Sequence, residues 1–524
     1  MSVQEFAHGH ERTEPPSLHL NSSNLDIESH VEAEPDEKGE DSTTTITWDS
    51  PHDPGNPYNW PPTRKWLVTG TALLGTLVVT LNGTSITVAA DAINGQFNVS
   101  DASFPNSYWP VFSWSLGGGL FIILFLPLME DLGIRKGFLI FYVFFFLMVI
   151  PQAVAQNFAT LIVTRFFAGG CVALLANTIA SIIPDVFESD EERSIPVGLY
   201  IMLYLVGSTL GPPMFAGVEQ HLDTWRWIFY IQLIIYGSLF PVFFFMIRET
   251  RSAVILRQRA KKLRKTSNKL IRTKSEINGI PFRTKLWRST TRPLLLLFTE
   301  PVLFASTLWS AFSFGTVYLF SQSVEQVFAE LYGWRGYSTG YVQGAVVIGE
   351  LLGWLATIYN SKLYLKSARR NNEMPGRPIP EARLYVSVFG SFFGITGGMF
   401  VYAWTSYPSL PWIAPAIGLA MVGFGIMTVV TAVADYVTDA YAASDYAGSA
   451  ISAVAFGENL VAGTLPLATG RIYTQLGFQW ASTLLGLLAF VLSLAPVVFL
   501  WKGTSLRARS PFMLSAGRET KVQV

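Results

Sequence analysis

Long uncharged hydrophobic runs, separated by short polar segments, occupy most of the chain from residue 63 to residue 501. Each run is close to the roughly 20 residues that an α-helix needs to cross the hydrocarbon core of a bilayer. A helix satisfies its own backbone hydrogen bonds in lipid, so these runs predict membrane-spanning helices. By run length we predict twelve spans, at residues 67–90, 107–128, 137–156, 158–183, 195–217, 226–247, 297–321, 338–359, 384–403, 410–432, 447–469 and 478–501.

The polar segments divide the predicted spans into two groups of six. The first 62 residues are rich in Glu, Asp, Ser, Thr and Pro, a composition that cannot bury a core, so we predict a disordered tail there. The central segment contains RQRAKKLRKTSNKLIRTK, which is either a specific binding site or, as we favour, a solvated helical linker attracted to lipid. We therefore predict a tail at 1–62, a helical bundle at 63–247, a basic linker at 248–293, a second bundle at 294–501 and a C-terminal tail at 502–524.

Lys and Arg gather in alternate loops, namely the central linker, the loop after the eighth span and the C-terminal tail. Because basic loops stay on the cytosolic side of a membrane, both termini and the linker are predicted to be cytosolic. The polar, acidic start of the chain does not resemble a signal peptide, so targeting would fall to the first membrane helix. We expect a multi-pass protein of the plasma membrane, with the vacuolar membrane as the alternative.

Composition narrows the class of protein. Half of the residues are hydrophobic and 14% are charged, against about 25% charged residues in soluble proteins. The single Cys171 rules out a disulfide framework, and the sequence holds no phosphate-binding loop, catalytic triad or metal-spaced His pair. Two six-helix bundles joined by a long linker are typical of secondary transporters. We therefore expect a carrier of a small-molecule substrate in the lipid bilayer that is driven by an ion gradient, is no enzyme, uses no cofactor and binds no nucleic acid. We also expect it to be a monomer.

The stretch LPLMEDLGIRKGF, residues 126–138, places four charges around one glycine directly after a hydrophobic run. A tight turn favours Gly, and an acid there can meet a helix N-terminus or a nearby basic side chain. The stretch resembles the loop between helices 2 and 3 of the major facilitator superfamily, whose pattern is Gly-x-Leu-x-Asp/Glu-x-x-Gly-Arg-Arg/Lys. Four positions match this pattern, Leu128, Glu130, Gly133 and Arg135, whereas Leu126 and Ile134 depart from it.

This resemblance extends over nearly all of the chain from Trp48 to Trp501 and is strongest to the fungal twelve-spanner drug:proton antiporter branch, which WRWIFYIQ and PEARL also fit. It implies the all-α fold of that superfamily, with twelve transmembrane helices in two pseudo-symmetric bundles. It also implies a cytosolic gating loop, although plain charges flanking a span are the alternative. The implied loop consists of Leu128, Glu130, Asp131, Gly133, Arg135 and Lys136.

Two further motifs resemble this branch. RFFAGG matches the Arg-x-x-x-Gly motif of the fourth helix, which implies that Arg165 holds or modulates a proton site. The alternative is that Arg165 snorkels to the outer interface. GSTLGPPMFAG resembles the fifth-helix antiporter signature, which in this family accompanies export against protons. Gly207, Gly211 and Pro212 match, and Gly217 stands just after the expected double glycine. Close helix packing without any coupling to protons is the alternative.

Two carboxylates fall in the middle of predicted spans, Glu350 in the eighth and Glu458 in the eleventh. Burial disfavours the charged form of a carboxylate, so each is a candidate for proton coupling, together with Arg165. Neutral or hydrogen-bonded structural roles are the alternative. Other polar or aromatic side chains within spans are candidates for the substrate cavity, although each could equally pack helices: Asn82, Trp114, Asn177, Tyr204, Tyr318, Gln322, Gln343 and Asn459.

These observations favour proton-coupled efflux of a drug, toxin, polyamine or secondary metabolite from a fungal cell. A proton symporter that imports a nutrient is the first alternative. A receptor or sensor on the same fold, which binds its ligand without transporting it, is the second. Asn98 begins an Asn-Val-Ser glycosylation motif in a loop predicted to face outward, and the sequence leaves its use open.

Overall fold

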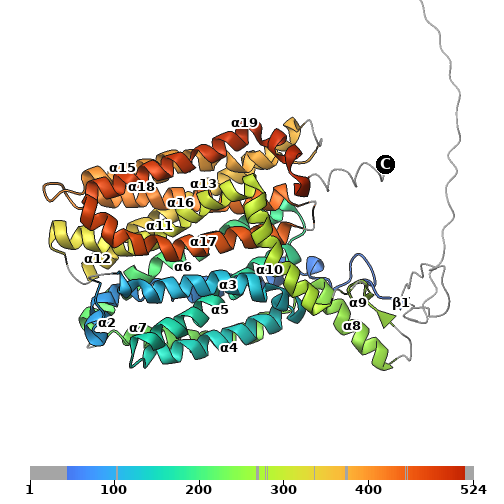
Figure 1. The fold of residues 1–524 in the computed structure, drawn as a ribbon. Coiled ribbons are helices and arrows are strands. Elements are labelled where there is room, and N and C mark those ends of the chain that lie inside the picture. The colour runs from blue at the N-terminus through green and yellow to red at the C-terminus, as the bar shows by residue number, and fades with distance from the viewer. Residues whose placement is uncertain are drawn as a thin grey trace, which may run out of the picture.

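The structure, a computed structural model, describes residues 44–101, 104–222, 224–266, 271–277, 279, 281–334, 337–371, 376–442, 444 and 446–513. It consists of two helical bundles that lie side by side with a helical linker at one end (Figure 1). We call this the linker end; α2 (Ala90–Phe97) and α12 (Tyr337–Val342) lie at the opposite end. Most of the predicted tail at 1–62 lies outside the described residues.

The first bundle contains α1 (Pro62–Thr80), α3 (Trp109–Leu132), α4 (Ile134–Ala153), α5 (Phe158–Val186), α6 (Asp190–His221) and α7 (Trp227–Met246). Three helices of the second bundle are continuous: α11 (Pro301–Tyr332), α16 (Ile413–Ala440) and α17 (Ala447–Leu476). Its other three spans consist of successive helical segments: α12 followed by α13 (Gly344–Ser367), α14 (Tyr385–Phe389) followed by a π-helical turn and α15 (Gly398–Thr405), and α18 (Phe478–Leu492) followed by α19 (Leu494–Arg509). Short 3-10 turns cover Pro57–Asn59, Thr87–Ala89, Asn106–Tyr108, Ala368–Arg370 and Pro380–Leu384, and the π turn covers Gly390–Gly397.

Within the described residues, eleven helices are long and apolar enough to cross a membrane, and each predicted span from 107 onward falls on one of them. The prediction of one continuous span at 67–90 is wrong. Here α1 ends at Thr80, turns follow to Ile86, and a 3-10 turn leads into α2. The residues at the break, Leu-Asn-Gly-Thr-Ser, explain it, because glycine and short polar side chains weaken a helix and bond to its backbone.

The linker contains α8 (Ser252–Thr266), β2 (Ile271–Arg272), α9 (Lys274–Ile277) and α10 (Phe282–Thr299). The strand β2 pairs in parallel with β1 (Thr44–Thr45), so the segment before α1 is held against the linker. The predicted seventh span began at 297, but residues 297–299 belong to α10. Pro301 ends this helix because the residue before a proline prefers an extended backbone, as Glu300 shows with ψ of 104°.

The two bundles meet along two seams. In one seam α3 packs against α17, and in the other α6 packs against α12 and α13. Glycine on α3 permits a close approach in the first seam, where a Cβ at Gly118 would lie 2.5 Å from the Asn459 amide oxygen of α17. Small residues at helix contacts are the usual means of close packing in membranes. These seams are where any motion of one bundle against the other must occur.

Candidate functional site

Arg165 lies on α5 with a fully buried side chain. Its guanidinium donates to three backbone carbonyls, those of Asn82 (3.1 Å), Gly83 (2.6 Å) and Pro110 (2.9 Å). Two of these carbonyls belong to the break after α1 and the third to the start of α3. Arg165 therefore satisfies backbone groups that the interrupted helix leaves without partners. Its side chain does not reach the surface of the molecule, so it does not snorkel.

Asn82 belongs to a buried polar network at this break. Its amide nitrogen donates to Gln232 of α7 at 2.9 Å, and Gln232 donates in turn to the Ser85 hydroxyl at 2.7 Å. The Tyr236 hydroxyl donates to the same Gln232 oxygen at 3.2 Å. Asn82 is thus bound within the first bundle rather than aimed at the seam between bundles. Gln232 was not among the predicted site residues, although a glutamine inside an apolar run indicates a buried polar contact.

Glu350 lies on α13 at the seam with α6, and its side chain is fully buried. The Thr209 hydroxyl of α6 donates to one carboxylate oxygen at 2.7 Å. The other oxygen is buried without a hydrogen-bond partner among the described residues. Because α13 and α6 belong to different bundles, this hydrogen bond joins the two bundles. Thr209 lies inside the antiporter-like motif, which places that motif beside the carboxylate.

Glu458 lies on α17 and is half-buried. The Ser310 hydroxyl of α11 donates to it at 2.5 Å, so this bond lies within the second bundle. Tyr200 and Tyr204 of α6 are close enough to interact electrostatically with Glu458. Tyr204 also stacks on Phe314 of α11, with ring centroids 5.7 Å apart. The result is a partly accessible carboxylate of the second bundle near two tyrosines of the first bundle.

The two carboxylates contact α6 at different heights. Thr209, which binds Glu350, lies five residues after Tyr204 and nine residues after Tyr200, the two tyrosines near Glu458. At 1.5 Å per residue these spacings correspond to about 7–14 Å along the helix axis. Glu458 lies nearer the linker end, because α6 begins there at Asp190.

The aromatic candidates Trp114 and Tyr318 face one another across the bundles, with ring centroids 6.2 Å apart. Both side chains are buried. The amides of Asn177 and Asn459 instead donate to carbonyls of their own helices at 2.8 Å. Each amide therefore has a hydrogen bond within its own helix, and the roles of Asn177 and Asn459 in a substrate cavity stay predictions.

Gln322 and Gln343 are buried in the second bundle, and the Gln322 side-chain oxygen has no hydrogen-bond partner among the described residues. Gln343 lines a small polar cavity at the end opposite the linker. Residues of both bundles line this cavity: Thr87, Val88, Ser321, Glu325, Thr339, Gly340 and Gln343. Gln343 therefore opens onto a cavity that both bundles line.

The glycines of the antiporter-like motif face α1 and the break after it. A Cβ at Gly207 would lie 2.7 Å from the Leu77 carbonyl oxygen, and one at Gly211 would lie 2.7 Å from the Ser85 nitrogen. Pro212 lies inside α6, and Gly217 lies near the Tyr341 hydroxyl of α12. The first two glycines therefore permit close packing within the first bundle. The face of α6 that carries Thr209 is left for the other bundle.

The predicted gating loop lies at the linker end and contacts the linker directly. Asp131 forms an ion pair with Lys285 of α10 at 2.5 Å, and its carbonyl accepts a hydrogen bond from Arg257 of α8 at 2.7 Å. Leu128 is half-buried and Lys136 is exposed. The Glu130 side chain lies outside the described part of the structure.

Gly133 forms the turn of this loop with φ of 84°, a conformation that favours glycine. The Glu249 carboxylate accepts hydrogen bonds from the backbone nitrogens of Ile134 (3.0 Å) and Arg135 (3.4 Å), so it caps the start of α4. Arg135 reaches the Phe244 carbonyl at 3.3 Å. The sequence analysis expected an acid of the loop to meet a helix N-terminus or a nearby basic side chain, and Asp131 meets the basic side chain of Lys285. The acid that caps α4 comes from the chain after α7.

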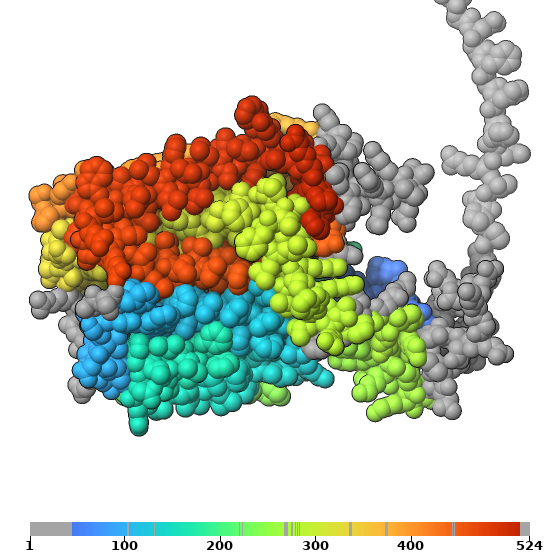
Figure 2. All heavy atoms as spheres, in the orientation of Figure 1, coloured from blue at the N-terminus to red at the C-terminus, as the bar shows by residue number. Residues whose placement is uncertain are grey.

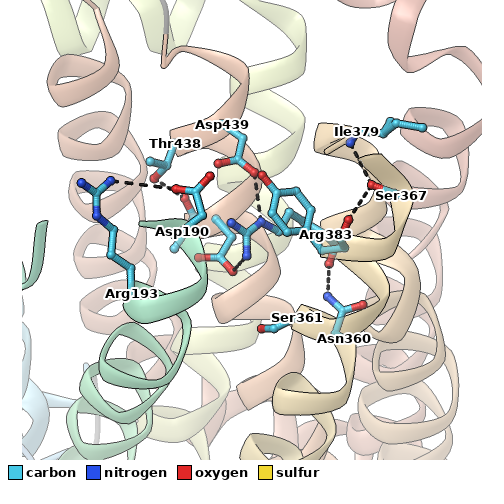
Figure 3. Close-up of polar contacts among 12 residues, drawn as sticks. Asp190, Arg193, Asn360, Ser361, Ser367, Ile379, Arg383, Thr438 and Asp439 are labelled. Carbon is cyan, nitrogen blue, oxygen red and sulfur yellow. Dashed lines mark hydrogen bonds and ion pairs between the residues drawn. The ribbon is translucent and has the colours of Figure 1, made fainter. Parts of the chain in front are cut away.

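The second bundle holds a charged cluster at the same end, drawn in Figure 3. Arg383 forms ion pairs with Asp435 (3.1 Å) and Asp439 (2.9 Å) of α16, and its guanidinium lies 3.5 Å from the ring centroid of Tyr364. Asp190, at the start of α6, interacts electrostatically with Tyr364 and lies beside this cluster. The sequence analysis noted PEARL, which contains Arg383, only as a family resemblance and did not select it as a site.

Comparisons with known proteins extend over most of the chain. Residues 72–463 match the Major Facilitator Superfamily. The MFS-type transporter paaT of Penicillium rubens is 30% identical over 90% of this chain and 84% of its own length. The cycloheximide resistance protein of Candida maltosa is 29% identical over 89% and 85%, and the efflux pump radE of Floropilus chiversii is 27% identical over 90% and 86%.

Proposed function

Because this chain belongs to the Major Facilitator Superfamily, we propose that it is a proton-coupled exporter of a small organic compound. Membership makes the chain a multi-pass membrane transporter rather than an enzyme. The similarity to an efflux pump and to a cycloheximide resistance protein supports export as the direction. The basic residues of the linker support a cytosolic position for the linker end. We place the protein in the plasma membrane, with the vacuolar membrane as the alternative.

The observation that carries this proposal is the hydrogen bond between Glu350 and Thr209 across the seam between the bundles. A carrier alternates between two arrangements, and a ligand shifts their balance only if it interacts differently with each. A proton on Glu350 meets this requirement, because the seam that surrounds the carboxylate must separate when the bundles move. In this proposal, protonation removes a charge from the closed seam, and loss of the proton favours its opening.

Glu458 supplies the second part of the proposal. A half-buried carboxylate beside Tyr200 and Tyr204 suits a substrate with a positive charge and an apolar body. The charge would pair with the carboxylate, and the rings would contact both the charge and the apolar surface. We therefore propose that the exported compounds include amphipathic organic cations. Substrate at Glu458 and a proton at Glu350 would favour different arrangements of the bundles.

Purified protein in vesicles with an imposed pH gradient tests the proposal, with cycloheximide and tetraphenylphosphonium as probes. We expect wild-type protein to move a probe against the direction of proton flow. In Glu350→Gln the gradient-driven rate should be at least tenfold lower than in the wild type. The exchange of labelled for unlabelled probe should continue. Glu458→Gln should weaken binding of the cation more than that of neutral cycloheximide. The matched control is Glu330→Gln, which changes an exposed carboxylate of α11.

Each alternative gives a different result in the same vesicles. A symporter would accumulate the probe in the direction of proton flow, and a receptor would bind the probe without flux. Gradient-driven transport by Glu350→Gln at the wild-type rate would remove Glu350 from proton coupling. Equal losses for the cation and for cycloheximide in Glu458→Gln would argue against a cation site there.

A further inference from the structure

The helix α10 crosses the ends of α3 and α17 instead of running beside them (Figure 1). It is the last helix of the linker and ends at Thr299, where the extended Glu300 and Pro301 turn the chain into α11. In Figure 2 it lies on the surface of the molecule across the boundary between the two bundles. This helix is part of the linker and is distinct from the basic α8.

The inner face of α10 contacts the first bundle. Lys285 forms its ion pair with Asp131, and the Ser289 hydroxyl donates to the Ile123 carbonyl at 3.3 Å. Four residues separate Lys285 from Ser289, so both lie on one face of the helix. Leu296 continues that face and is fully buried.

The same helix also contacts the second bundle. The Arg292 guanidinium lies 4.9 Å from the ring centroid of Tyr446, which directly precedes α17. The body of α10 packs against α17 and α11 as well as against α3. It therefore spans the seam between the bundles and contacts a residue on each side, Asp131 in the first bundle and Tyr446 before α17 of the second.

The outer face of α10 combines large apolar side chains with arginine. Trp287, Leu295 and Phe298 are 70%, 52% and 76% exposed. At about 100° per residue all three point away from the side that carries Ser289. Arg283 and Arg288 are also exposed, on either side of this apolar stripe. Residues 282–299 contain four basic side chains and no acidic one.

We propose that α10 lies in the membrane interface at the linker end and binds anionic phospholipid with its outer face. Apolar side chains flanked by arginine suit a helix that rests at the boundary between headgroups and acyl chains. The unbalanced positive charge selects anionic headgroups. Bound lipid would fix α10 across the seam and so brace the two bundles against each other. The proposal needs a membrane protein but does not depend on the direction of transport or on proton coupling.

The depth of α10 can be measured with a spin label. Cys171 is the only cysteine in the sequence and is buried, so Trp287→Cys in a Cys171→Ser background allows specific labelling. In phosphatidylcholine vesicles with 30% phosphatidylserine, the label at 287 should collide more often with oxygen than with a water-soluble nickel chelate. The matched control is Lys261→Cys on the exposed face of α8, where the chelate should dominate. Equal chelate accessibility at 287 and 261 would overturn the proposal.

Lipid selectivity can be measured by the retention of phosphatidylserine during native mass spectrometry. Each basic side chain near an anionic surface strengthens binding about fivefold, so Arg283→Gln with Arg288→Gln should weaken retention about 25-fold. The control is Arg369→Gln with Arg370→Gln, which removes two exposed charges elsewhere at the linker end. Equal losses in the two double variants, or displacement of the lipid by millimolar inorganic phosphate, would refute a lipid site on α10. The spin-label result stands without these variants.

Discussion

The ion pair between Asp53 and Arg259 fastens the segment before α1 to the linker helix α8. Both nitrogens of the Arg259 fork donate to the Asp53 carboxylate, at 2.5 and 2.9 Å, and the Gly55 backbone nitrogen donates at 2.7 Å. The Asp53 side chain is only 3% exposed. The hydrogen bonds from Arg259 outweigh the opposing effect of burial and lower the pKa of Asp53 from 3.8 to about 2. We predict that Asp53→Asn releases this segment.

The pKa gives the size and the pH dependence of the effect. At about 1.4 kcal/mol per pKa unit, a fall from 3.8 to about 2 corresponds to about 2 kcal/mol. The pKa of the docked carboxylate lies below that of the released one, so docking stabilises the charged form. The stabilisation is therefore complete above about pH 5 and is lost as the pH falls from about 4 toward 2. At neutral pH, Asp53→Asn should increase opening of the segment about 30-fold.

Hydrogen exchange of residues 48–60 in detergent-solubilised protein measures this opening. The matched control is Asp49→Asn, because Asp49 also pairs with Arg259, at 3.4 Å, but is 70% exposed. Such a surface pair contributes no more than about 1 kcal/mol. A double-mutant cycle with Arg259→Gln should assign most of the effect to the pair with Asp53. Similar exchange rates in Asp53→Asn and Asp49→Asn would refute the reasoning.

Two further predictions use pairs of glycines and thermal unfolding in detergent. Gly133 and Gly477 have φ of 84° and 77°, so alanine costs a similar backbone strain at both, but only at Gly133 would its Cβ also displace the Glu249 carboxylate. Gly133→Ala should therefore lower stability by about 1 kcal/mol more than Gly477→Ala, and equal losses would contradict the helix cap. Gly207→Ala would force α6 away from α1 and should cost about 1–3 kcal/mol, whereas Gly70→Ala, with open space around it, should be neutral or stabilising. If Gly207→Ala and Gly70→Ala have the same melting temperature, the close contact of α1 with α6 is not a source of stability.

Hydrophobic run length predicted the fold well because bilayer thickness sets helix length independently of tertiary contacts. It failed where a run did not cross the membrane as one helix. The seventh span was predicted to start at 297, but residues 297–299 belong to α10, which crosses the ends of α3 and α17, and run length carries no information on helix direction. At 81–86 the polar residues that break the first span were visible, but Arg165, which satisfies the broken backbone, comes from another helix.

Charged residues in apolar runs indicated the candidate site, since burial of such groups needs a reason. Their partners were beyond prediction, because common residues far along the chain supply them. Thr209 is 141 residues from Glu350, and Ser310 is 148 residues from Glu458. Hydroxyl side chains occur in nearly every span, so nothing in the sequence distinguishes these two. The functional roles of both carboxylates stay predictions until transport is measured.

The cap on α4 has a consequence for how the protein is made. Glu249 lies 115 residues after Ile134, and its carboxylate accepts a hydrogen bond from the Ile134 backbone nitrogen. At about 5–20 residues per second, the ribosome adds Glu249 roughly 6–23 s after it completes the turn that Glu249 caps. During that interval α3 and the turn have been synthesised, but the carboxylate that caps α4 has not. A truncated chain that stopped after α7 at Met246 would stay in that condition, since the missing carboxylate is encoded only three codons further on.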